Sequence, residues 1–219
     1  MSAATASGGA ALRCVPVPPE RHQELIEHLR QSFFADEPLN RAVGLCRRGE
    51  PHPELERHCL QTLGQSLSCM VVDAQHKIAG AALNGLIRRG EREECERRLG
   101  ELRDDNFKRI FELLYRLNDR VDLFEENGVE ELFEVRILSV DEAHRGRGLA
   151  QLLLDGSLGT ASSRGFKVVK ADATGVFSQR VFLKRGFEVR TEIAYSEVEA
   201  RLRPGPPHQA LKLMVKLLD

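Results

Sequence analysis

Apolar residues follow two spacings along the chain, one typical of helices and one typical of strands. Recurrence at intervals of three and four residues predicts helices at about 19–36, 53–64, 107–121, 149–163 and 174–185. Short apolar runs bounded by Gly, Pro and polar residues predict strands at 13–17, 68–72, 78–87, 131–140, 166–171, 188–197 and 211–217. Residues 41–49 are expected to be irregular. Charges of both signs dominate 88–105, which favours the solvated face of a helix.

This order of elements predicts an α+β fold whose centre is a β–α–β unit spanning residues 131–171. The chain has 219 residues, enough for one domain with a full core. We expect that domain at residues 12–219. Residues 1–11 are rich in Ala, Gly and Ser and lack the charged start and long apolar core of a signal peptide, so we expect a disordered tail.

The composition is that of an ordinary soluble globular protein, with 42% hydrophobic and 30% charged residues. A net charge of −1 gives no reason to expect nucleic acid or an anionic membrane as a partner. No apolar run approaches the roughly 18 residues needed to span a bilayer. Five cysteines without a CxxC motif favour reduced thiols and a cytoplasmic location. The spacing of Cys and His matches no zinc pattern, so no metal is expected.

A Gly- and Arg-rich turn joins the predicted strand at 131–140 to the helix that follows. The first N–H groups of a helix have no intrahelical partner and can bind a pyrophosphate. Gly146 and Gly148 would let the backbone approach such an anion, while Arg145 and Arg147 add positive charge. A solvated turn that only caps the helix would explain the same residues. The spacing Arg145-x-x-Gly148-x-Ala150 after a strand resembles the acyl-CoA motif of the GNAT superfamily of N-acyltransferases.

Acyl transfer to an amine requires a base, because an alkylammonium with a pKa near 10 must lose a proton before it attacks. Glu37 is the best candidate, since Pro38 holds its backbone out of a helix and apolar neighbours could raise its pKa. An exposed loop carboxylate is an equal alternative. Thr174 and Ser178 lie one helical turn apart, so both hydroxyls could face one spot. Helix capping by Thr174 and a surface position for Ser178 would also fit.

Several segments resemble the insect-type arylalkylamine N-acetyltransferases, which include dopamine N-acetyltransferases. The most specific is Phe33-Phe34-x-Asp36-Glu37-Pro38-Leu39-Asn40. The others are 83–89, Ile137-Leu138-Ser139-Val140-Asp141, the Arg145 to Ala150 turn, Ser178-x-Arg180-Val181, Lys184-x-Gly186-Phe187 and Pro207-His208.

The resemblance implies roles for these positions in a GNAT fold, a central mixed sheet flanked by helices. Glu37 matches the general base, acting through water, Ser178 matches a serine of the catalytic relay, and Thr174 stands where the family has a second serine. Phe182 stands where many GNAT enzymes have a tyrosine general acid, so thiolate protonation falls to Ser178 or water. The residues expected at acetyl-CoA are Leu138, Ser139, Val140, Arg145, Gly146, Arg147, Gly148, Leu149 and Ala150, and those expected at the amine are Phe34, His58 and His208.

We therefore expect an N-acetyltransferase that moves acetyl from acetyl-CoA to an arylalkylamine such as dopamine, serotonin, tyramine or tryptamine, by direct attack in a ternary complex. The expected partner is a small-molecule amine, and the chain could be a monomer or a dimer. An aliphatic amine such as agmatine or a polyamine, or histamine, is the alternative acceptor. A catalytically weak CoA-binding regulatory protein is the alternative from another class.

Overall fold

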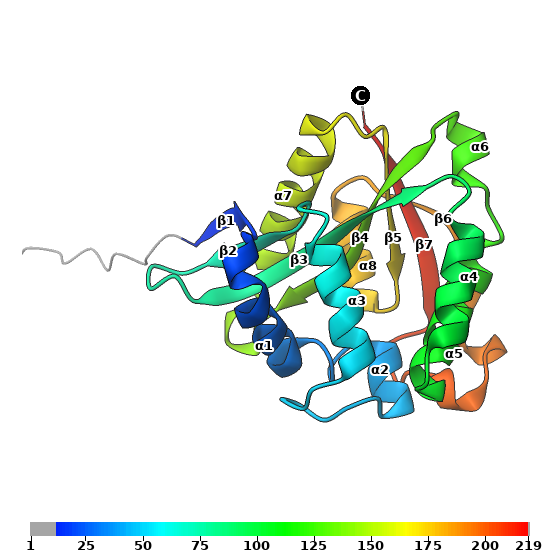
Figure 1. Ribbon diagram of the computed structural model, residues 1–219, viewed down its shortest axis with the longest axis horizontal. Helices are drawn as coiled ribbons and strands as arrows, with labels where there is room; N and C mark the ends of the chain where they lie inside the picture. Colours follow the sequence, from blue (N-terminus) through cyan, green and yellow to red (C-terminus); the bar gives the residue numbers. More distant parts are fainter. Residues whose placement is uncertain (1–11, 219) are drawn as a thin grey trace, which may run out of the picture.

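A mixed sheet of seven strands forms the centre of the computed structural model, which describes residues 12–218 (Figure 1). The predicted tail at 1–11 lies outside this part of the chain. The strands lie in the order β1-β2-β3-β4-β5-β7-β6, and only β4 and β5 pair in parallel. The strands are β1 (Arg13–Pro16), β2 (Cys69–Val72), β3 (Ile78–Arg88), β4 (Glu131–Val140), β5 (Val168–Ala173), β6 (Glu188–Ala194) and β7 (Ala210–Leu217).

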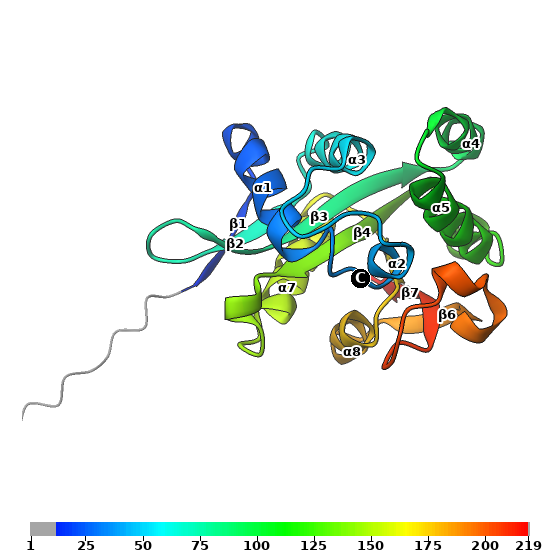
Figure 2. The same ribbon diagram turned by 90° about the horizontal axis from the view of Figure 1, so that it is seen from below.

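Helices cover both faces of the sheet (Figure 2). One face packs against α1, α3 and α5, and the opposite face packs against α7 and α8. The helices are α1 (His22–Ser32), α2 (Pro38–Val43), α3 (Pro53–Leu63), α4 (Arg92–Glu101), α5 (Asp105–Asn118), α6 (Leu123–Asn127), α7 (Leu149–Ser163) and α8 (Val176–Lys184). Short 3₁₀ turns lie at Pro19–Arg21, Glu142–His144, Tyr195–Glu197 and Ala200–Leu202.

The central β–α–β unit is confirmed, with strand and helix at the predicted residues 131–140 and 149–163. The prediction that 41–49 is wholly irregular was wrong, because α2 begins at Pro38 and extends to Val43. Proline suits the first position of a helix, where its missing N–H is not needed. The predicted strand at 188–197 ends at Ala194, where the chain turns into a 3₁₀ segment.

β4 pairs with β3 along its whole length but with β5 only near its start, and this opens the sheet. Its parallel pairing with β5 covers Phe133 with Val169 and Glu134 with Lys170. Its antiparallel pairing with β3 continues to Val140. The register with β3 shifts between Leu83 and Asn84, so that Arg136 is an extra residue on β4, a β-bulge. Beyond the bulge, the edge of β4 that faces β5 is free to receive another chain-like molecule.

Candidate active site

A cleft of about 1900 Å³ lies where β4 and β5 part. The corner between α1 and α2 forms one wall of the cleft, and α3, α4 and α5 form a second wall. The starts of α7 and α8 form the third. All but two of the predicted site residues line this cleft, the exceptions being Phe34 and Arg147. The fold therefore gathers residues that are up to 171 positions apart, from Glu37 to His208, around one space.

Glu37 is the N-cap residue of α2, with an extended backbone (φ −60°, ψ 133°). Its Oε2 accepts a hydrogen bond from the backbone N–H of Asn40 at 2.7 Å. Its Oε1 is buried and accepts no hydrogen bond of good geometry. Burial raises the pKa of this carboxyl, and the hydroxyl of Thr174 and the N–H groups of Asn40 and Leu39 offset part of the increase. The site thus holds a carboxyl that is readier than usual to take a proton.

Thr174 and Ser178 do not share a helix, because α8 begins at Val176 with Gly175 as its N-cap. Thr174 directly follows β5, and its hydroxyl lies beside the carboxyl of Glu37. The hydroxyl of Ser178 donates to the carbonyl of Gly175 at 2.9 Å. The hydrogen bond to Gly175 must therefore break before Ser178 can transfer its proton to another group.

Tyr195 fixes the backbone of Thr174, and it was not among the residues predicted from the sequence. Its hydroxyl donates to the backbone carbonyl of Thr174 at 2.7 Å. Burial and the nearby charge of Glu37 raise the pKa of Tyr195. The pairing of β6 with β7, and of β7 with β5, brings this residue to Thr174, so no local motif could have revealed it.

The Gly-rich loop, residues 145–148, has the geometry that the sequence predicted. Gly146 (φ 75°) and Gly148 (φ 79°) both adopt left-handed conformations, which glycine reaches without strain. Gly148 is the N-cap of α7. Arg145 donates to the carbonyl of Val140 at 3.3 Å and to Asp36 at 2.9 Å. Leu149 and Ala150 begin α7, so the open N–H groups of this 15-residue helix face the loop.

The part of β4 that lines the cleft carries three of the residues expected at acetyl-CoA. Leu138, Ser139 and Val140 lie on the stretch of β4 beyond its pairing with β5. Ser139 is buried, and its hydroxyl lies 3.0 Å from the hydroxyl of Ser32 at the end of α1. Because β3 pairs with only one edge of β4, backbone groups on the other edge remain available for hydrogen bonds.

Aromatic side chains line the cleft on the wall formed by α3 and α5. His58 on α3 packs edge-to-face on Phe111 of α5, with ring centroids 5.1 Å apart, and Phe111 packs on Tyr115 at 6.1 Å. Burial and the charge of Arg136 lower the pKa of His58 to about 4, so this ring is neutral at pH 7. Phe34 does not line the cleft, contrary to the prediction from the sequence. Its side chain is fully buried in the core with α1, and its neighbour Phe33 lines the cleft instead.

His208 lies beside the start of α8. Its Nδ1 accepts the N–H of Val176 at 3.2 Å, and its ring packs edge-to-face on Phe177 at 6.0 Å. A side chain at Gly175 would meet both Pro38 (3.1 Å) and His208 (3.4 Å), so glycine permits the close approach of α2, α8 and the 208 loop. His208 is therefore a positioning residue for the α8 N-terminus as well as a wall of the cleft.

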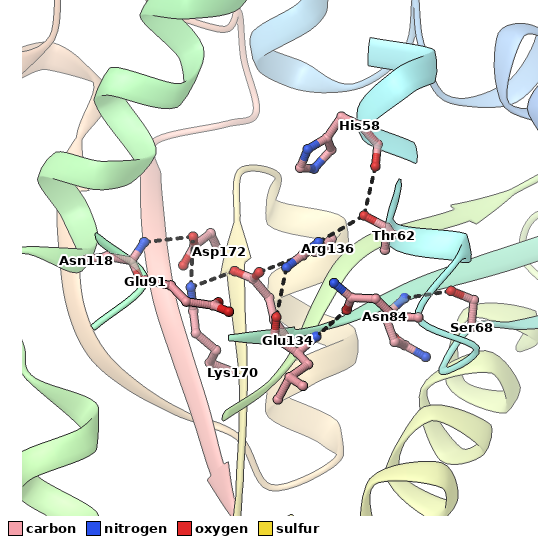
Figure 3. Close-up of polar contacts among 12 residues, drawn as sticks. His58, Thr62, Ser68, Asn84, Glu91, Asn118, Glu134, Arg136, Lys170 and Asp172 are labelled. Carbon is pink, nitrogen blue, oxygen red and sulfur yellow. Dashed lines mark hydrogen bonds and ion pairs between the residues drawn. The ribbon is translucent and has the colours of Figure 1, made fainter. Parts of the chain in front are cut away.

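A buried ionic network forms the floor of the cleft between β4 and β5 (Figure 3). Lys170 donates to Glu134 at 2.7 Å and to Asp172 at 3.1 Å. Asn118 of α5 donates to the same Oδ2 of Asp172 at 2.8 Å. Arg136 donates to the second oxygen of Glu134 at 2.9 Å and to Thr62 at 3.0 Å. The sequence carried a signal for this network, because charged residues alternate within the apolar runs Glu134-x-Arg136 and Lys170-x-Asp172.

Within residues 12–218, no group of three or more His, Cys, Asp and Glu side chains is arranged to hold a metal ion. In the same part of the chain, no helix is both long and apolar enough to cross a membrane.

The sequence matches no established family profile. Solved structures are similar over nearly the whole chain. Arylalkylamine N-acetyltransferase 2 from Aedes aegypti is 44% identical with a TM-score of 0.92, over 95% of this chain and 99% of that one. A mosquito arylalkylamine N-acetyltransferase-like 5b protein is 25% identical with a TM-score of 0.85, over 95% and 100%.

A Drosophila melanogaster polyamine N-acetyltransferase, which forms N-acetylagmatine, shares the fold at 21% identity and a TM-score of 0.84, over 95% of this chain and 100% of that one. An identity of 21% supports the shared fold alone. The 44% identity to the Aedes aegypti enzyme, over almost all of both chains, shows the family. The chain belongs to the insect arylalkylamine N-acetyltransferases of the GNAT superfamily.

Proposed function

We propose that the protein transfers acetyl from acetyl-CoA to the primary amine of an arylalkylamine such as dopamine, serotonin, tyramine or tryptamine. The observation that carries this proposal is the single cleft in which Glu37, the Gly-rich loop and an aromatic wall meet. The family supplies the reaction class. Phe111 and Tyr115 supply an aryl-compatible surface, since offset and edge-to-face ring contacts stabilise aromatic pairs.

Acetyl-CoA fits the cofactor side of the cleft. Gly146 and Gly148 leave room for an anion at the N-terminus of α7, and Arg145 can add a charge-assisted hydrogen bond. The free edge of β4 at Leu138 to Val140 suits the amide groups of the pantetheine arm, which can extend the sheet as a peptide strand does. The thioester would then lie between β4 and β5, close to the end of β5 at Thr174.

Glu37 acts as the general base in this mechanism. A general base is most effective when its pKa lies near the pH at which the enzyme works, and burial raises the pKa of Glu37 in that direction. A water molecule carries the proton from the ammonium to its carboxylate. The Thr174 hydroxyl orients that carboxylate, and Tyr195 fixes Thr174 through its carbonyl.

Ser178 protonates the departing thiolate, directly or through water, as the C–S bond breaks, and its hydroxyl takes in exchange the proton that the amine nitrogen loses when the tetrahedral intermediate becomes the amide. Its position in the first turn of α8 sets the hydroxyl at the mouth of the cleft, and a rotation away from Gly175 frees its proton. Phe182 cannot take this role. It is buried and packs on Phe187 with centroids 4.9 Å apart. Transfer is direct, without a covalent enzyme intermediate. The proposed location is the cytoplasm, which the cysteine pattern supports.

A thiol-release assay with acetyl-CoA tests the proposal across dopamine, tyramine, serotonin, tryptamine, histamine, agmatine and spermidine. We expect the highest kcat/KM for the aryl amines. Activity on agmatine or spermidine alone would overturn the substrate class, and CoA binding without turnover on any amine would favour a regulatory protein. Glu37→Ala should lower kcat/KM by about a hundredfold or more at pH 7 and by less at pH 9, where more amine is already unprotonated. A pH–rate profile unchanged by this substitution would remove Glu37 from the role of base.

A further inference from the structure

The segment that joins β5 to α8 is held in place by side chains. Thr174 and Gly175 lie between the two elements and belong to neither. The backbone carbonyl of Thr174 accepts a hydrogen bond from the hydroxyl of Tyr195 at 2.7 Å. The carbonyl of Ala173 accepts one from Nε2 of Gln179 at 2.9 Å. The peptide groups on the two sides of the Thr174 Cα are therefore bound by two different side chains.

Gln179 connects α8 to two strands. Its side chain is buried, and the same Nε2 donates to the carbonyl of Ala210 at 2.8 Å. Because both partners are carbonyl oxygens, only the amide nitrogen can face them, which fixes the orientation of the amide. Ala173 is the last residue of β5, and Ala210 is the first residue of β7. One amide group thus ties the helix to the end of one strand and the start of the other.

This arrangement determines where the two hydroxyls of the proposed proton relay lie. Peptide groups are planar, so fixing both peptides beside the Thr174 Cα leaves its backbone dihedrals little freedom and sets the direction of its side chain. That direction brings the hydroxyl beside the carboxyl of Glu37. Ser178 directly precedes Gln179 in the first turn of α8. The anchor that fixes Thr174 therefore also fixes the helical turn that carries Ser178.

We propose that Gln179 is a positioning residue for the acetyl transfer, which holds the hydroxyls of Thr174 and Ser178 in one fixed arrangement. This inference rests on the proposed function. Gln179 does not line the cleft, so it acts on the reaction through these neighbours. A displacement of about 1 Å at catalytic groups lowers rates by about a hundredfold, so a loosely held segment should slow proton transfer without weakening the binding of acetyl-CoA.

Gln179→Met tests the proposal, because it keeps the length of the side chain and removes both donated hydrogen bonds. We expect kcat with the preferred amine to fall about tenfold to a hundredfold. KM for acetyl-CoA should stay within about twofold, since the Gly-rich loop and the free edge of β4 are unchanged. A folded Gln179→Met enzyme with wild-type kcat would overturn the inference and leave the acetyltransferase function intact. A wild-type enzyme that acetylates no amine would overturn both.

The same substitution in a protein without the two hydroxyls separates positioning from a general effect. In Thr174→Val/Ser178→Ala, Gln179→Met should lower kcat by less than about threefold, because the groups that it positions are absent. An equal loss in both backgrounds would contradict the proposal. Gln179→Asn is the milder variant if Gln179→Met does not fold. Its shorter side chain cannot donate to both carbonyls from the same backbone, so kcat should be intermediate, and a wild-type kcat would again count against the inference.

Asn84→Leu is the matched control. Asn84 is also buried, and its amide nitrogen donates to the carbonyl of Leu67 and to the hydroxyl of Ser157, both at 3.0 Å. None of these three residues lines the cleft. The substitution should lower the midpoint of urea unfolding, as Gln179→Met does, and leave kcat within about twofold. A loss of kcat as large as that in Gln179→Met would show that lost stability explains both, and the proposal would fail.

Discussion

Arg145 of the Gly-rich loop donates a hydrogen bond at 2.9 Å to Asp36, the residue immediately before Glu37. Arg48 pairs with the same carboxylate at 3.0 Å and with Glu142 beside the loop at 2.9 Å. The corner that carries the proposed base is thus joined by ion pairs to the loop proposed to bind pyrophosphate. A phosphate group that takes Arg145 must compete with Asp36.

Asp36→Asn should therefore strengthen acetyl-CoA binding. The pair is partly exposed, and such pairs contribute about 0 to 1 kcal/mol, so we expect a dissociation constant a few-fold lower in titration calorimetry at low salt. The gain should shrink as salt screens the exposed charges. Arg145→Ala is the contrasting variant and should weaken binding. Weaker binding in Asp36→Asn would mean that Asp36 supports the loop instead of competing with phosphate.

Thr174 variants separate the hydroxyl from the shape of the side chain. Thr174→Ser keeps the hydroxyl and should retain kcat within a few-fold. Thr174→Val keeps the shape, and we expect kcat to fall about tenfold or more. Since the hydroxyl lowers the pKa of Glu37, its removal should also move the acidic limb of the pH–rate profile to higher pH. A profile that stays in place would show that Thr174 does not act on the carboxyl.

His58 should make stability depend on pH in a defined direction. Its folded pKa of about 4 lies below the value near 6.5 of an unfolded histidine, so folding favours the neutral ring. This contribution is complete above about pH 6.5 and is lost as the pH falls toward 4. Urea unfolding should show that the free energy of unfolding of the wild type falls, relative to that of His58→Phe, as the pH is lowered. A difference that stays constant from pH 7 to pH 4.5 would contradict a buried neutral His58.

Two glycine substitutions should have opposite effects on stability. A Cβ at Gly85 would lie 2.3 Å from Cζ of Arg136, whose guanidinium crosses β3 at this point. Hydrogen bonds to Glu134, Thr62 and the Leu86 carbonyl hold this guanidinium in place, so Gly85→Ala should break part of them and lower the free energy of unfolding by about 1 to 3 kcal/mol. Gly159 is exposed within α7 and meets nothing within 4 Å, so Gly159→Ala should raise it by about 0.5 to 1 kcal/mol. Chemical denaturation of both variants checks the pair, and a Gly85→Ala protein as stable as wild type would place Arg136 elsewhere.

Local physics made part of the site predictable. Pro38 fixes the backbone around Glu37, and glycine is needed at 146 and 148 for their left-handed backbone, so both features could be predicted from sequence. Phe34 could not be assigned correctly, because which of two adjacent phenylalanines faces the core depends on α1 ending at Ser32.

Long-range pairing decided the rest of the site. Glu134 and Asp172 share Lys170 only because β4 and β5 pair in parallel, with Glu134 opposite Lys170. Alternating charges inside an apolar strand indicate that something polar is buried there, but they do not name the partner. The same limit applied to Tyr195, which reaches Thr174 from the end of β6, two strands away from β5.

The free edge of β4 differs from the exposed edge of an ordinary sheet. A strand with unpaired backbone groups is usually a template for aggregation when it lies at the rim of a sheet. Here the unpaired stretch lies in the middle of the sheet, between helices that pack on both faces, and it lines the cleft. The backbone groups that could extend the sheet therefore face the inside of the cleft and not the rim of the sheet.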